Sequence, residues 1–566
     1  MASSDTSAVA IIADAHFHDI HSNYDGAGLY VDGQRLTLRS WADTRASSRV
    51  FNESGAALAT ALDQVQRRGI RHVVLLGDYT DDGQAESTER LAGVLAQFRG
   101  RFGTNFYALP GNHDVFGPLG KHQSTRFVTE PGKSVLVTSD PDDAATEPES
   151  AILTPRMYRE GMPAALMPMA EHGYFKAPEY LHWETPFGTS DAVEDRMYTA
   201  RSADETVAHR LMDASYLVEP EPGLWLLMID ANVFEPRSGS YRPDQKKAFI
   251  DSTDAGWNAV LRVKSFLLDW IGDVCRRADK EGKTLLAFSH YPVIDPFDDA
   301  KDSESALFGE TEIVRRRPAP AVADALINAG LRYHFSGHYH VNAVSRRQGP
   351  AGQLTNISVP SPVAFPSGFM IARPKDQGCD IEKVPLDTAP IDPRVMAIYR
   401  DEEASLGEHR DPALDCKDYG SFLYRQMHSR VQHHYLPRKW PQEIAEAVEN
   451  ASAANLGCWF LAESGGSKAP PSGMTQLASL AAQRGIDIAH LQNLSMTELI
   501  GDWYCLRQAG PMAAGHIPAD RMVLYRFLAQ EFGDPQPAKE NYLIRFFAIF
   551  LSVLDRSISR MKPPIH

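Results

Sequence analysis

The sequence predicts a layered α/β fold followed by a mainly helical region. Short, continuous apolar runs, typical of strands buried on both faces, recur along the first 390 residues. Apolar residues at helical spacing separate several of these runs, and alternating strands and helices imply layered α/β architecture. The chain of 566 residues is far longer than the ~150-residue prior for one domain, so we expect more than one domain.

The individual elements follow in chain order. Continuous apolar runs predict strands over residues 8–13, 72–76, 105–109, 224–229, 284–289 and 331–336. Apolar residues at helical spacing predict helices over residues 58–65, 91–98 and 267–274. Gly69 and Gly100 follow the first two of these patterns and are expected at helix ends.

Two regions depart from this alternation. Residues 115–223 are rich in Pro, Met and aromatic residues, and we interpret them as an inserted cap segment that sets substrate choice. A Pro-punctuated stretch over residues 385–395 is a linker candidate, after which helical patterns dominate. We therefore predict a domain over residues 1–390, with the 115–223 insertion, and a helical domain over residues 391–566. The helical domain could cap the site, form a dimer interface or bind a partner.

Composition excludes several classes of protein. The chain carries 57 Lys and Arg against 73 Asp and Glu, a net charge of −16, which argues against broad nucleic-acid binding. A hydrophobic share of 43% excludes dominant disorder. The five cysteines form no C-x-x-C pair, which argues against a disulfide framework and a thiolate zinc site. We find no export signal and no transmembrane segment, so a cytoplasmic location is expected.

Side chains of metal-ligand type follow five of the predicted strands. They form the motifs D-x-H at 14–16, GD-x-x-D at 77–81, GNHD at 111–114, a single His at 290 and GH-x-H at 337–340. Open α/β sheets place their sites at such strand ends. Asp, Asn and His donors without thiolate suit manganese, iron or zinc. The glycines before Asp78, Asn112 and His338 are expected to allow the sharp turns that aim these ligands.

This ordered set of motifs resembles the calcineurin-like metallophosphoesterase superfamily over roughly residues 8–375. The resemblance implies a two-sheet α/β sandwich with helices on its outer faces and a site for two metal ions, Mn, Fe or Zn. It assigns one ion to Asp14, His16 and His340, the other to Asn112, His290 and His338, and the bridging position to Asp78.

The resemblance also implies how such a site hydrolyses a phosphoester. A metal-bridging hydroxide attacks the phosphorus, and the net positive charge of the site attracts the phosphate anion. His113 stays off the metals and is the expected general acid, with Asp114 holding its imidazole in the useful tautomer. Asp82 and Gly83 are expected to form a turn. The pair at 433–434 has no acidic or Cys partner at ligand spacing, so we interpret it as a solvated or core-edge feature.

Departures from subfamily patterns narrow the substrate. Asp82 and Asp114 stand where Ser/Thr protein phosphatases of the superfamily carry Arg and Glu, and His113 stands where lipid A precursor pyrophosphatases carry Arg. The motifs look nearest to the class III cyclic-nucleotide phosphodiesterase branch. We expect a small-molecule or lipid-linked phosphoester, with phosphodiesters favoured over phosphomonoesters.

Two alternatives remain at this point. A DNA or RNA nuclease of the same superfamily would need a basic groove, which only the Arg run at 315–317 suggests. A non-catalytic scaffold that keeps the fold should have lost ligands, and this chain retains every one. Oligomeric state is not predicted.

Overall fold

The structure is a computed structural model that describes residues 8–297, 300–375, 378–462, 471–534 and 541–560. Its first sheet has five strands, and β1 at its centre pairs in parallel with β4 and antiparallel with β18. In spatial order the strands are β19 (Gly378–Pro385), β18 (Gly368–Lys375), β1 (Val9–Ile12), β4 (His72–Leu76) and β5 (Asn105–Leu109). Every residue of β1 and β4 is buried, as their continuous apolar sequences predict.

The second sheet has seven strands, and its four central strands run parallel. In spatial order they are β16 (Ala343–Gly349), β17 (Gly352–Ser358), β15 (Tyr333–Ser336), β14 (Thr284–Phe288), β13 (Leu224–Met228), β12 (Tyr216–Glu221) and β9 (His182–Glu184). All six strands expected from apolar runs are therefore present, each within two residues of the predicted bounds.

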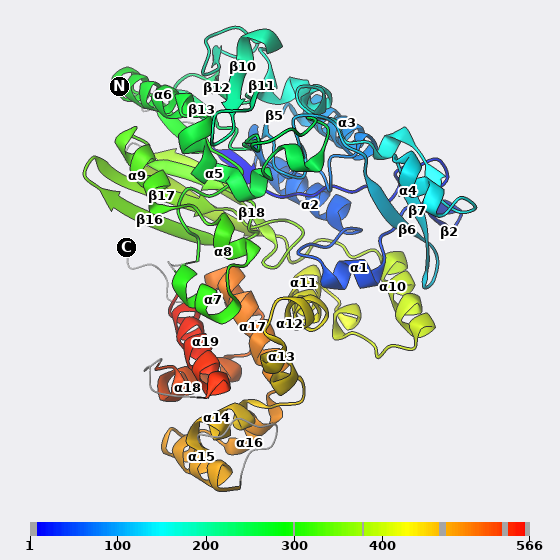
Figure 1. Cartoon of the computed structure of the whole chain (residues 1–566), viewed down its shortest axis with the longest axis vertical. Coiled ribbons are helices and arrows are strands. Elements are labelled where there is room, and N and C mark those ends of the chain that lie inside the picture. Colours follow the sequence, from blue (N-terminus) through cyan, green and yellow to red (C-terminus); the bar gives the residue numbers. More distant parts are fainter. Residues whose placement is uncertain (1–7, 298–299, 376–377, 463–470, 535–540, 561–566) are drawn as a thin grey trace.

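The two sheets share one hydrophobic core, as in a sandwich. A single apolar cluster joins Val9 and Leu75 of the first sheet to Leu226 and Phe335 of the second. Helices cover the outer faces (Figure 1), namely α2 (Ser54–Arg67), α3 (Ala85–Phe102), α5 (Ser252–Val263), α6 (Phe266–Glu281) and α9 (Pro320–Asn328). The predicted two-sheet α/β architecture is confirmed.

The segment expected to be an inserted cap contains more strand than its sequence indicated. It holds the small sheet of β6 (Ser124–Glu130), β7 (Lys133–Thr138) and β8 (Ile152–Leu153), the hairpin of β10 (Met197–Arg201) and β11 (Ala208–Met212), and α4 (Pro141–Thr146). Its β9 and β12 are the last two strands of the seven-stranded sheet, with β9 at the edge. Part of residues 115–223 thus completes the sandwich, because Tyr216 and Leu217 are fully buried in this sheet.

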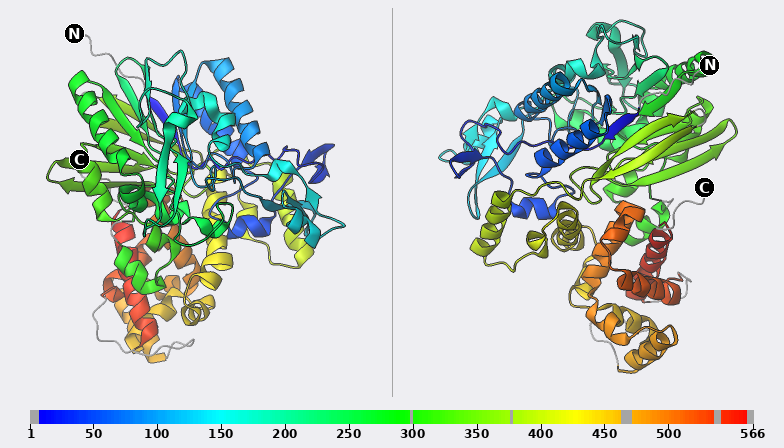
Figure 2. Two further views of the ribbon diagram at one scale, coloured as in Figure 1. Left: turned by 45° about the horizontal axis from the view of Figure 1, so that its top comes forward. Right: turned by 180° about the vertical axis from the view of Figure 1, so that it is seen from behind.

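The chain after β19 is helical, and α10 begins at Pro393 as the sequence predicts. Its helices are α10 (Pro393–Leu406), α11 (Tyr419–Arg430), the π-helical turn η7 (Val431–Tyr435), α12 (Leu436–Arg438), α13 (Gln442–Glu449), α14 (Ala453–Ala462), α15 (Pro471–Gln483), α16 (Ile488–Asn493), α17 (Met496–Ala509), α18 (Ala519–Phe532) and α19 (Tyr542–Ser559). Figure 2 shows this helical region against one side of the sandwich, with α14–α16 farthest away. Across the described ranges, none of the helices is both long and apolar enough to cross a bilayer.

The helical region shares a hydrophobic core with an early segment of the chain. Leu36, Trp41 and Val50 belong to the same apolar cluster as Phe422 and Trp503. The short helix α1 (Trp41–Ala46) is also capped from this region, because Glu402 accepts hydrogen bonds from its first backbone N–H groups at 2.8 and 3.0 Å. A division into domains at residue 390 stays a prediction.

Candidate metal centre

The five motif loops meet at one edge of the sandwich, because the strands that precede them end there. The loop after β1 is tied to the loop after β4, since Asp14 N donates to Gly77 O at 3.1 Å and His16 N donates to Asp78 O at 2.8 Å. The loops after β14 and β15 are tied likewise, since Gly337 N donates to the carbonyl of His290 at 2.9 Å. Each sequence motif is therefore brought to the same place, as expected for carboxyl ends of parallel strands.

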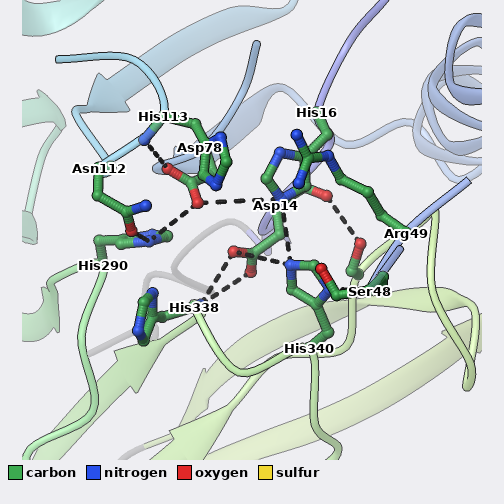
Figure 3. Close-up of polar contacts among 12 residues, drawn as sticks. Asp14, His16, Ser48, Arg49, Asp78, Asn112, His113, His290, His338 and His340 are labelled. Carbon is green, nitrogen blue, oxygen red and sulfur yellow. Dashed lines mark hydrogen bonds and ion pairs between the residues drawn. The ribbon is translucent and has the colours of Figure 1, made fainter. Parts of the chain in front are cut away.

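The predicted ligands form two adjoining groups (Figure 3). In the first group the nitrogen and oxygen donors of Asp14, His16 and His340 lie within 4.8 Å of one another. In the second group the donors of Asp78, His290 and His338 do so. Asp78 also joins the groups, since its Oδ2 lies 3.3 Å from His290 Nε2 and 3.9 Å from His16 Nε2.

Asn112 completes the second group. Its Oδ1 lies 3.2 Å from His290 Nε2, on the side of that ring that faces Asp78 in Figure 3. Together the two groups contain all seven residues predicted as ligands, drawn from five loops that span most of the sandwich sequence. Whether each one binds a metal stays a prediction.

The glycines of the motifs are required by close approach. A Cβ atom on Gly111 would lie 2.1 Å from Asp78 Oδ1, and one on Gly337 would lie 2.4 Å from Asp14 Oδ2. These glycines have no positive φ, so the sharp turns expected there are not what requires them. The backbone itself passes so close to the carboxylates that no side chain fits.

Several of the predicted ligands themselves have an unusual backbone conformation with a positive φ angle. Positive φ angles occur at Asp14 (52°), His16 (40°), Asp78 (46°), His338 (73°) and His340 (54°). This region is costly for residues other than glycine and persists where the surroundings over-determine it, which is typical of functional sites.

The chemistry of the donor set fits cations. His16 Nε2 and His340 Nε2 face each other at 3.1 Å, and buried His16 Nδ1 has no partner within the described ranges. Burial lowers the pKa of His16 and His338 well below the ordinary value and that of His340 to about 3, so these imidazoles are neutral at pH 7. Burial, together with the Asp78 charge, raises the pKa of Asp14 to about 8. His290 differs, because the Asp78 charge outweighs burial and raises its pKa to about 9. Three neutral imidazoles and a carboxylate destabilised by burial still match what a metal ion requires.

His113 stands beside this cluster and pairs with Asp82. Its Nδ1 lies 2.8 Å from Asp82 Oδ1, and its backbone N–H donates to Asp78 Oδ1 at 2.7 Å. Burial lowers the pKa of His113, but the charges of Asp78 and Asp82 outweigh burial and raise it above the ordinary value. Asp82 is itself held at 3.2 Å by Arg159 and, on the same oxygen, by Gln123.

The role expected for Asp114 is wrong in this geometry. Its carboxylate accepts hydrogen bonds from the backbone N–H groups of Gly111 at 2.9 Å and Thr80 at 2.9 Å, and from the Thr80 hydroxyl at 2.8 Å. Asp114 therefore fixes the ligand loops, and Asp82, which was expected only in a turn, orients the imidazole. The sequence favoured Asp114 because it adjoins His113 along the chain. Asp82 lies 31 residues away and reaches His113 only through the conformation of the loop after β4.

A cavity of about 690 Å³ opens over His16, Asp78 and His338. From the expected cap segment only Phe116 and Arg159 line it, so the prediction that this segment sets substrate choice is not supported by the lining. The helical region contributes more of the wall, namely Arg430, His434, Tyr435, Lys439, Trp503, Tyr504, Arg507 and Gln508. His434, which was interpreted as a solvated or core-edge residue, lies in this wall.

The helical region is also attached to one of the ligand loops. The carbonyl oxygens at the end of α17 accept from Asn342, which follows His340 by two residues. The backbone N–H of Asn342 donates to Gln508 O at 2.8 Å, and its side-chain amide donates to Ala509 O at 2.9 Å. The last carbonyl groups of a helix have no donor within the helix, and here the loop supplies the donors.

A two-sheet α/β sandwich with two adjoining groups of Asp, Asn and His donors at one edge offers a candidate site for two metal ions. Comparison with known proteins agrees: residues 8–148 match the family model described as calcineurin-like phosphoesterase. Among solved structures, a dimetal phosphatase from Danio rerio is similar at 15% identity and a TM-score of 0.35, covering 67% of this chain and 96% of its own. No protein of curated function matches the chain.

The similarity to the calcineurin-like phosphoesterase family extends over residues 8–148. The remaining motifs, His290 and the pair His338 and His340, lie outside this matched segment but inside the same site. The family and the donor groups support metal-dependent hydrolysis of a phosphoester.

Proposed function

We propose that this chain hydrolyses phosphodiesters in preference to phosphomonoesters, with His113 as the general acid. The observation that carries the proposal is the pairing of His113 with Asp82 beside the convergent donors. Asp82 accepts a hydrogen bond from Nδ1–H, so the proton that the protonated ring can give to a departing alkoxide is the one on Nε2. The raised pKa of His113 keeps this proton in place at higher pH than an ordinary histidine would.

The chain's own residues hold this acid and the substrate. Arg159 and Gln123 fix the carboxylate of Asp82, and thereby the direction of the imidazole. Asp14, His16 and His340 on one side, and Asn112, His290 and His338 on the other, with Asp78 between them, would hold two metal ions, Mn, Fe or Zn. When bound, such ions activate water and neutralise the charge that develops on the phosphoryl oxygens.

The size of the cavity supports a diester. A volume of about 690 Å³ is far more than one phosphoryl group fills, so there is room for organic groups on both sides of the phosphorus. His113 is most useful for poor alkoxide leaving groups, because a good leaving group departs without a proton.

The proposal is tested by removing metal from the protein and reloading it with manganese, iron or zinc. Bis-p-nitrophenyl phosphate and p-nitrophenyl phosphate are then compared by kcat/KM. We expect hydrolysis only after reloading and a higher kcat/KM for the diester. A preference for the monoester would refute the diester assignment, and the absence of hydrolysis with metal bound would refute catalysis.

The role of His113 is tested in the same preparation with His113→Asn. We expect kcat for loss of an alkoxide from a dialkyl phosphate to fall by about 10²–10⁴-fold, and kcat for loss of p-nitrophenolate from methyl p-nitrophenyl phosphate to fall much less. The matched control is His21→Asn, because His21 is exposed on the loop after the first motif. Equal losses for alkyl and aryl leaving groups would contradict general-acid catalysis.

A further inference from the structure

The wall that the helical region gives to the cavity has both aromatic and cationic character. Tyr435 and Tyr504 stack with ring centroids 4.1 Å apart and planes only 2° from parallel. Both rings line the cavity, together with Trp503. A flat apolar surface therefore adjoins the metal centre on the side of η7 and α17.

Most cations of the cavity already have acidic partners. Arg49 is bound to Asp81, Arg159 to Asp82, Arg316 to Asp254, Arg507 to Glu304 and Lys439 to Glu312, at nitrogen–oxygen distances from 2.8 to 3.6 Å. Their charges are therefore largely compensated within the protein.

Arg430 differs from these cations. It lines the cavity, yet none of its guanidinium nitrogens has an ionic or hydrogen-bonding partner within the described part of the chain, and its Nε is buried. Its guanidinium carbon lies 4.5 Å from the centroid of the Tyr435 ring. A stacked guanidinium is pre-organised, and its hydrogen-bond donors remain available to a planar anion.

The placement of Arg430 follows from the local backbone. Arg430 is the last residue of α11, and the helix continues directly into the π-helical turn η7, which ends at Tyr435. π-helical turns occur frequently at functional sites because they redirect side chains.

We propose that Arg430 binds a second anionic group of the substrate, carried by the organic part that lies along Tyr435 and Tyr504. The inference rests on the proposed function, and it defines the substrate as a phosphoester with a flat or apolar body and a terminal carboxylate or phosphate. The reacting phosphoryl group has a different cationic neighbour, because Arg49 lies beside His16 and His340 in Figure 3.

The experiment measures binding of non-hydrolysable phosphonates to the manganese-loaded full chain by calorimetry. Phenylphosphonate carries one anionic group, and 4-phosphonobenzoate and 4-(2-carboxyethyl)phenylphosphonate carry a second at two different reaches. We expect the wild-type protein to bind at least one of the carboxylates more tightly than phenylphosphonate. Arg430→Gln should weaken the binding of that carboxylate by about 10–100-fold and the binding of phenylphosphonate by less than about twofold.

Two further variants separate binding from folding. Arg430→Lys keeps the charge without the planar fork and should restore part of the affinity. Arg438→Gln is the matched control, because Arg438 is exposed on α12 and does not line the cavity, and it should bind all three phosphonates like the wild-type protein.

Other outcomes would overturn the inference. Equal weakening of all three phosphonates by Arg430→Gln would place Arg430 at the reacting group or in the folding of the wall. A wild-type protein that does not distinguish the carboxylates from phenylphosphonate would remove the second subsite. Hydrolysis of bis-p-nitrophenyl phosphate by the same preparation reports separately on the proposed function, since its loss with selective binding intact would refute catalysis alone.

Discussion

Two buried clusters of acidic and histidine side chains, one in the sandwich and one in the helical region, have opposite electrostatic designs. In the sandwich, burial raises the pKa of Asp14 to about 8 and lowers the pKa of His16 and His338 well below the ordinary value, and the ring nitrogens of His16 and His340 face each other. In the helical region, one carboxylate, that of Asp502, is surrounded by donors.

Asp502 on α17 is completely buried, and both of its carboxylate oxygens accept hydrogen bonds. Its carboxylate accepts from the hydroxyl of Tyr424, from the hydroxyl of Tyr525 at 2.5 Å, from His428 Nε2 at 3.0 Å and from Arg521 at 3.3 Å. Burial raises the pKa of Asp502, but His428 and the tyrosine hydrogen bonds outweigh burial and lower it.

The backbone distinguishes the clusters in the same way. Five residues of the sandwich cluster have positive φ, whereas Asp502 lies in the middle of a regular helix. A cluster that is internally balanced stabilises the fold, and a cluster with surplus acceptors held in strained backbone is prepared for a cation. The composition of a buried cluster therefore says less about its role than the balance of its donors and acceptors.

The largest expected effect comes from removing the charge at the centre of the unbalanced cluster. Asp78→Asn keeps the shape of the side chain but loses the carboxylate that lies between the two donor groups. We expect kcat for bis-p-nitrophenyl phosphate to fall on the order of 10³-fold, with bound metal reduced, because preorganised charge at the site is lost. Metal content and kcat are measured on the same sample.

The other carboxylate of this cluster tests stability. Burial raises the pKa of Asp14 to about 8, so folding disfavours its charged form, and we expect the free energy of unfolding of the metal-free Asp14→Asn protein to equal or exceed that of the metal-free wild-type protein. A clear loss of stability instead would mean that the two clusters are built on the same principle.

The balanced cluster should respond in the opposite way. Asp502→Asn leaves Arg521 and the tyrosine hydroxyls without their ionic acceptor, and we expect the free energy of unfolding of the helical region to fall by about 3 kcal/mol. Denaturation followed by tryptophan fluorescence measures this loss, because Trp503 is adjacent in sequence and buried. Asp555→Asn is the matched control, since Asp555 is exposed on α19.

Acid should reproduce this loss in the wild-type protein. Because the pKa of Asp502 is lowered in the folded state, its contribution is present above the ordinary carboxyl value and disappears as pH falls through the folded pKa. The stability of Asp502→Asn should therefore depend less on pH below about 4 than that of the wild-type protein. Identical acid profiles would show that Asp502 carries little of the stability.

The smallest of the three mutational effects is expected at Asp82, which orients His113 beside the donor groups. Asp82→Asn retains a hydrogen-bond acceptor for His113 Nδ1 but removes the charge that Arg159 also binds. We expect kcat to fall by about 10–100-fold, with KM nearly unchanged, because the imidazole is positioned less well. Asp114→Asn provides the contrast, since it should reduce stability through the backbone contacts of the ligand loops. A larger effect on kcat from Asp114→Asn would restore the role first expected for that residue.

The sandwich and its convergent side chains could be predicted from sequence because both depend on local signals. Apolar runs locate β1, β4, β5, β13 and β14, and residues placed directly after parallel strands must meet at one edge. The partner of His113 could not be predicted, since Asp114 adjoins it along the chain whereas Asp82 reaches it from the loop after β4. The strands β9 and β12 were missed because Pro and aromatic residues around them obscure the period of two.

The wall of the cavity was beyond sequence reasoning for another reason. Arg430 and Tyr504 follow the last motif of the site by many residues and belong to largely buried helices, in which cavity-facing side chains look like core. Their position depends on how α11 and α17 pack against the sandwich, which no local pattern encodes.

The hydrogen bonds from Asn342 to the end of α17 make the conformation of a ligand loop depend on the helical region. A gene fragment that encoded only the sandwich would leave the backbone and side-chain amides of Asn342 without the acceptors Gln508 and Ala509, two residues after His340. Recombination that exchanged the helical region would therefore alter the metal loop as well as the cavity wall. New substrates for this chain are then expected to arise by point substitution within the helices rather than by module shuffling.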